Sequence, residues 1–63
     1  MISGNMKQFW FIGRDSQRVI CGIIEQNKTI AIDNFKKRNH EVMDAIKKEH
    51  GTIFVVQEVD AIV

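Results

Sequence analysis

β-branched side chains dominate the apolar part of this chain and constrain its fold more than any other feature. Ten isoleucines and six valines stand among the 63 residues, whereas leucine, proline and tyrosine are absent. Such side chains lose rotamer freedom in a helix and pack well on a pleated sheet, so we expect a β-rich domain. A chain this short buries only about 60% of the surface that its unfolded form exposes, which limits residues 1–63 to one domain and excludes a two-domain enzyme.

The first strand is predicted immediately before Gly13. Residues 7–12 contain three successive aromatic side chains and no polar face at helical spacing. Residues 13–17 concentrate turn formers, so the chain should reverse there. Residues 1–5 show no periodicity and are expected to fray.

Residues 18–25 can be read in two ways, and the choice decides the topology. As a helix, capped by Asp15, the segment would place its four large aliphatic side chains on one arc of about 140°. As a strand, it benefits from four isoleucine or valine residues and one glycine, all unfavourable inside helices. We favour the strand, which then pairs with a third strand over residues 28–32 through a turn at Asn27.

The clearest helix signals surround residues 39–50. Asn39 can cap the helix, basic residues and His50 occupy its last turn, and Gly51 can end it. A start at Asp33 or Asn34 is the alternative, but it would place Asn39 on the apolar face, so we favour a start near residue 39. Residues 52–59 have high β-propensity and form the predicted last strand.

These elements predict an α+β domain in the order β-β-β-α-β, an antiparallel sheet with one helix packed on one face. Pairing Ile12 with Arg18 places the side chains of the first hairpin's alternate residues beneath that helix, and the second hairpin adds three isoleucines. The predicted helix-covered face consists of Phe9, Phe11, Val19, Cys21, Ile23, Ile30 and Ile32.

The opposite sheet face is then too apolar to be left in water. We expect an interface on this face, with Gly22 diagonal to Trp10 and leaving room for the indole to lie over the backbone. The predicted protein interface consists of Trp10, Ile12, Ile20 and Ile24.

Charge is distributed unevenly although the net charge is only +1. Residues 1–38 carry seven basic and three acidic side chains, and residues 39–63 carry two basic and five acidic ones. The one basic cluster, Lys36, Lys37 and Arg38, could follow a phosphate backbone while the sheet face contacts bases. Nucleic-acid binding is therefore the alternative function.

Candidate catalytic and metal-binding residues form no recognisable constellation. His40 and Asp44 lie one helical turn apart but supply two ligands where a stable metal site needs three or four. Cys21 lies on the apolar side of its strand and is expected to be a structural thiol, and His50 is assigned to the helix terminus. We predict no enzyme, no catalytic residue, no metal and no cofactor.

The length of the apolar runs and the number of cysteines indicate the partner and the cellular compartment. Its longest apolar runs contain four residues, far below the roughly 20 of a membrane span, and its one cysteine cannot form an internal disulfide. We expect a soluble cytoplasmic protein with no membrane partner. The predicted function is that of a small non-enzymatic regulator or inhibitor, including those encoded by phages, that binds another protein and forms a homodimer.

Overall fold

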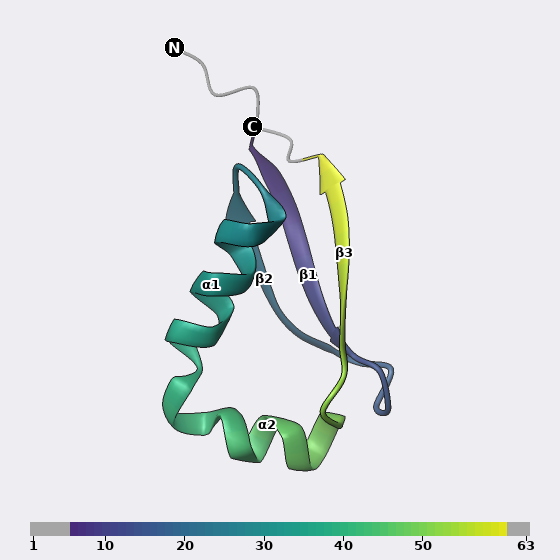
Figure 1. The fold of residues 1–63 in the computed structure, drawn as a ribbon. Coiled ribbons are helices and arrows are strands. Elements are labelled where there is room, and N and C mark those ends of the chain that lie inside the picture. Colours follow the sequence, from purple (N-terminus) through teal and green to yellow (C-terminus); the bar gives the residue numbers. More distant parts are fainter. Residues whose placement is uncertain (1–5, 61–63) are drawn as a thin grey trace.

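The computed structural model describes residues 6–60, so the predicted fraying of residues 1–5 lies outside the described residues. The fold is α+β, with three antiparallel strands in the order β2-β1-β3 and two helices. Figure 1 shows α1 alongside the sheet and α2 running across its end. The elements in chain order are β1 (Lys7–Gly13), β2 (Val19–Glu25), α1 (Lys28–Arg38), the 3-10 helix η1 (His40–Val42), α2 (Met43–His50) and β3 (Phe54–Asp60).

The predicted order β-β-β-α-β with a single helix is wrong, because residues 28–32 belong to α1. Asn27 has an extended backbone, and its side-chain oxygen accepts a hydrogen bond from the Ile30 amide at 2.9 Å. This N-cap starts a helix that buries Ala31 and Phe35, one turn apart, against the sheet. Packing on that face outweighs the β-propensity of the isoleucines in the same segment.

Asn39 ends α1 and directly precedes η1, but its side chain does not cap a following helix as predicted. Its side-chain amide donates to the Phe35 carbonyl at 2.8 Å, so it closes the C-terminus of α1. The second helix follows after η1 and ends, as predicted, at Gly51, whose φ of +90° suits glycine. Its last turn is closed by a 2.8 Å hydrogen bond from the Gly51 amide to the Lys47 carbonyl.

The strand predicted for residues 18–25 is confirmed, but its register with β1 differs from the prediction. Phe11 pairs with Cys21 and not with Val19, a shift of two residues that keeps the expected faces. Nearer the turn, Ile12 pairs with Val19, which leaves Ile20 as the extra residue of a β-bulge. The bulge interrupts the alternation, so Val19 joins the face of Ile12 while Ile20 packs against the core.

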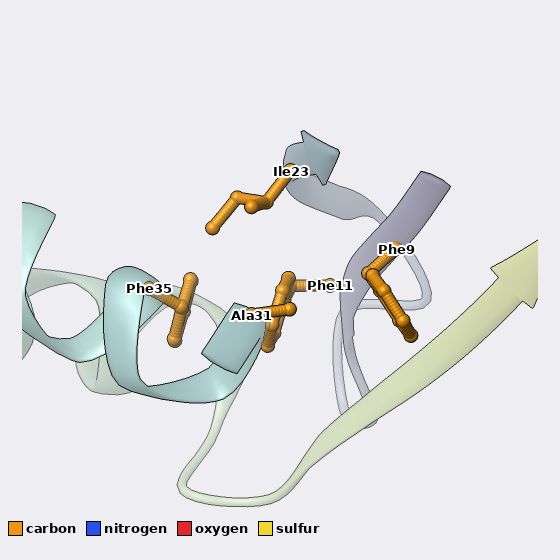
Figure 2. Close-up of a cluster of buried hydrophobic side chains, with 5 residues drawn as sticks. All are labelled: Phe9, Phe11, Ile23, Ala31 and Phe35. Carbon is orange, nitrogen blue, oxygen red and sulfur yellow. The ribbon is translucent and has the colours of Figure 1, made fainter. Parts of the chain in front are cut away.

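The buried core lies between the sheet and α1 (Figure 2). It consists of Phe9, Phe11, Ile23, Ala31 and Phe35. The rings of Phe11 and Phe35 stack in parallel with centroids 4.3 Å apart, and Phe54 meets Phe35 edge-on at 5.5 Å. Replacing Phe35 with alanine would cost about 3–5 kcal/mol, a large fraction of the stability of so small a domain.

Candidate protein interface on the open sheet face

The sheet face that points away from the helices is apolar on all three strands. We call it the open sheet face. Side chains alternate along β1, so Gln8, Trp10 and Ile12 lie on this face together with their partners on the two neighbouring strands. Those partners are Val19, Gly22, Ile24, Val55, Gln57 and Val59. None of these nine residues is ionisable.

Five large side chains on the open sheet face remain accessible within the described part of the chain. Their exposed fractions are 39% for Trp10, 54% for Val19, 48% for Ile24, 47% for Val55 and 40% for Val59. Isolated exposed apolar side chains are common on protein surfaces, whereas a contiguous group marks an interaction site.

Gly22 leaves room for the Trp10 indole to lie against the backbone on this face. The two residues are direct cross-strand partners, not diagonal neighbours as predicted. A Cβ atom added to Gly22 would lie 2.5 Å from Cζ3 of the indole, closer than packed carbon atoms approach. The indole therefore covers the glycine backbone, and a larger residue at position 22 would displace it.

The predicted interface residues divide between the two sides of the sheet. Trp10, Ile12 and Ile24 lie on the open sheet face, whereas Ile20 packs against the core because of the bulge. Sequence reasoning missed Val19, Val55 and Val59. The alternation of Val55, Gln57 and Val59 was visible in the sequence, but only the β1–β3 register assigns it to this face.

The basic cluster and the open sheet face lie on opposite sides of the molecule. Lys36, Lys37 and Arg38 form the last turn of α1, in the helical layer. Lys37 forms an ion pair of 2.9 Å with Asp33 on the same helix. The cluster and Trp10 therefore form no continuous surface that one stretch of nucleic acid would contact.

Cys21 is half-buried near the end of α1. Burial raises the pKa of its thiol above the ordinary value of 9.0, while the Arg38 charge and a hydrogen bond with Asn39 act in the opposite direction. The group is thus almost entirely a neutral thiol near pH 7, which disfavours nucleophilic chemistry.

One side-chain contact that the sequence did not reveal joins the β1–β2 turn to α2. The Ser16 hydroxyl lies 2.6 Å from Nδ1 of His50, and the same oxygen accepts the Arg18 amide at 3.2 Å. Glu49 accepts a 2.9 Å hydrogen bond from Arg18, while its carboxylate is 3.7 Å from Nε2 of His50. Serine, histidine and a carboxylate are the residue types of a hydrolytic triad, but the two cavities beside α1 and η1 have neither Ser16 nor His50 in their lining.

We interpret the Ser16–His50 contact as a tether between the turn and the helix. The two residues are 34 positions apart, so no local pattern could have indicated the contact.

Residues 6–60 contain no group of three or more histidine, cysteine, aspartate or glutamate side chains that could hold a metal ion. Within the same range no helix has the length and apolarity needed to cross a membrane.

Comparisons with protein-family models, curated proteins and solved structures find no match for this chain. Its function is therefore argued from the geometry of its surfaces.

Proposed function

We propose that this protein acts without catalysis, as a small regulator or inhibitor that binds protein through its open sheet face and forms a homodimer there. A regulator of this size is also what a phage can encode, and the lone cysteine suits the reducing cytoplasm. The single observation that carries the proposal is the group of accessible apolar side chains on a face without ionisable groups.

A second copy of the chain is the partner that this face fits best. In a two-fold dimer the same patch of both copies meets, so a charge near the two-fold axis would face its own copy. The open sheet face carries none, and its apolar residues are complementary to themselves. Two sheets packed face to face, about 10 Å apart, are a common way of burying such surfaces.

The size of the face indicates a weak dimer. Three strands of seven residues cover about 23 by 14 Å, from a rise of ~3.3 Å and a spacing of ~4.8 Å. Covering roughly 300 Å² would contribute about 7 kcal/mol per copy at ~25 cal/mol per Å². Association costs about 4–15 kcal/mol in lost freedom, and stable interfaces bury about 800 Å² per partner. Dimers should therefore form only at high protein concentration.

Self-association would also stabilise the folded state of a protein with a small core. The core of the described residues contains five buried apolar side chains, which is modest for a chain of this length. Because a partner that binds only the folded state stabilises it by mass action, the melting temperature should rise with protein concentration.

The experiment is sedimentation across a wide concentration range, with Ile24→Glu as the interface variant. Ile30→Glu is the matched control, because Ile30 is also exposed but lies on α1 in the helical layer. We expect dimers in the wild type and in Ile30→Glu, and a monomer in Ile24→Glu. A wild type that stays monomeric at the highest concentration, and that loses no target binding on Ile24→Glu, contradicts the proposal.

Nucleic-acid binding is the second candidate, favoured by the three successive basic residues at the end of α1. It would use the helical layer, where a cavity of about 450 Å³ is lined by Lys37, Arg38 and His40 together with Glu41 and Val42. Binding that weakens steeply with salt and is lost in Lys36→Glu or Lys37→Glu would support this candidate. Binding lost only in Ile24→Glu would exclude it.

A further inference from the structure

A second apolar surface lies on the helical side of the sheet. A groove of about 480 Å³ opens between α1, α2 and β3, and its apolar lining includes Met43, Phe54 and Val56. It exists because α1 packs against β2, while α2 runs across the end of the sheet instead of along β3 (Figure 1). The part of the sheet formed by β3 is thus incompletely covered. The volume lies within the roughly 300–1,000 Å³ of small-molecule sites.

The ionisable side chains that line this groove are lysines and a histidine. They are Lys36 of α1, His40 of η1 and Lys47 of α2, and no acidic residue among the described residues joins them in the lining. Within residues 6–60, neither Lys36 nor Lys47 forms an ion pair. Apolar walls with two unpaired lysines favour an occupant that has a hydrocarbon body and a negative head.

The lining favours an alkyl chain over a peptide. A peptide backbone brings amide groups that need hydrogen-bond partners when they leave water. Apart from the two lysines, Thr52 and His40 are the only polar side chains among the described residues that line the groove. An alkyl chain has no amide groups that require hydrogen bonds, and the carboxylate of a fatty acid can form ion pairs with the two lysines.

We propose that the groove binds a fatty-acid-type amphiphile, with its chain against Met43, Phe54 and Val56 and its carboxylate between Lys36 and Lys47. The site is on the opposite side of the sheet from the dimer face and does not depend on the proposed function. Neighbouring β3 residues separate the two surfaces, since Val56 lines the groove whereas Val55 lies on the open sheet face.

The first test is an NMR titration with decanoate below its micelle-forming concentration. Decyltrimethylammonium serves as the control because it has the same tail and the opposite charge. We expect saturable decanoate shifts at the Met43 and Val56 methyl groups, unchanged signals for the Trp10 indole and Ile24, and much weaker binding of the cation. Equal binding of both amphiphiles, shifts centred on Trp10 and Ile24, or no decanoate binding at all would overturn the proposal. Binding of an acidic amphipathic peptide in place of decanoate would also overturn it.

The second test uses paired lysine variants. The double variant Lys36→Gln, Lys47→Gln should bind decanoate about tenfold more weakly, since each exposed charge contact contributes modestly. The double variant Lys37→Gln, Lys48→Gln changes the same charge on the same helices at residues outside the groove lining, and it should bind like the wild type. An equal loss in both pairs would show nonspecific charge attraction and overturn the proposal.

The two proposals can fail separately. Ile24→Glu should leave decanoate binding unchanged while it abolishes self-association. Sedimentation of the lysine variants should match the wild type. A protein that dimerises but ignores decanoate refutes the groove site alone, and a monomer that binds decanoate refutes the dimer alone.

Discussion

The indole of Trp10 lies over the backbone of its cross-strand partner Gly22, at a separation that leaves no room for a Cβ atom. This contact holds the aromatic ring against the backbone at the centre of the open sheet face. Gly22→Ala should displace the indole into solvent and shift its fluorescence emission to longer wavelength. The expected loss of stability is at most about 1 kcal/mol, because a partly exposed side chain can move aside.

A double-mutant cycle isolates that contact. In a Trp10→Ala background, Gly22→Ala should stabilise the protein by about 0.5 kcal/mol, since alanine is less flexible than glycine in the unfolded chain. Urea denaturation measures both values. Equal effects of Gly22→Ala in the two backgrounds would show that the ring and the glycine do not interact.

The β-bulge at Ile20 makes two isoleucines of β2 respond differently to the same substitution. Ile20→Glu places a charge against the core and should destabilise the monomer by about 2 kcal/mol or more. Ile24→Glu lies on the open sheet face and should change monomer stability by no more than about 0.5 kcal/mol. Chemical denaturation at low protein concentration compares them, and a more destabilising Ile24→Glu would contradict the bulge assignment.

The N-cap at Asn27 should account for the start of α1. Asn27→Ala removes the acceptor for the Ile30 amide and should cost about 1 kcal/mol. Asn27→Asp and Asn27→Ser keep an acceptor at the cap and should retain most of that stability. The midpoint of urea unfolding provides the measurement. Equal stability of the alanine and aspartate variants would rule out a capping role.

The Ser16–His50 tether should contribute to stability and not to chemistry. Ser16→Ala is expected to cost about 1 kcal/mol, and the cost should vanish in a His50→Ala background. Denaturation curves of the four proteins give the coupling. Ester hydrolysis by the wild type that either substitution abolishes, without a change in stability, would instead make these residues catalytic.

Cys21 should cause part of a loss of stability in alkaline solution. Burial raises its pKa in the folded state, so as pH rises above 9.0 the unfolded chain loses its thiol proton before the folded protein does. Folding free energy linked to this group is thus fully present below pH 9.0 and declines as pH rises through the folded-state pKa. Cys21→Ala should show a shallower decline than the wild type when unfolding is followed against pH.

Thiol modification offers an independent check on the same group. The rate of alkylation should reach half its maximum above pH 9.0, and Arg38→Gln should raise that midpoint further because the Arg38 charge lowers the pKa. A midpoint below that of the urea-unfolded protein would contradict the assigned direction.

The sequence by itself determined the features that depend on neighbouring residues. The aromatic run before Gly13, the β-branched residues of 19–25 and those after Gly51 are local signals, and all three became strands. The alternation of side chains along residues 7–12 and 18–25 also indicated an apolar surface around Trp10 and Ile24. Alternation assigns side chains to sheet faces even when the partner strand is unknown.

Only the tertiary structure decided the rest. Residues 28–32 favour a strand in isolation. The N-cap at Asn27 and the burial of Ala31 and Phe35 against the sheet stabilise a helix there instead. The bulge that moves Ile20 to the core, the β1–β3 pairing that adds Val55 and Val59 to the open sheet face, and the tether from Ser16 to His50 are contacts between distant residues. Their free energies depend on which surfaces meet, and local propensity does not contain that information.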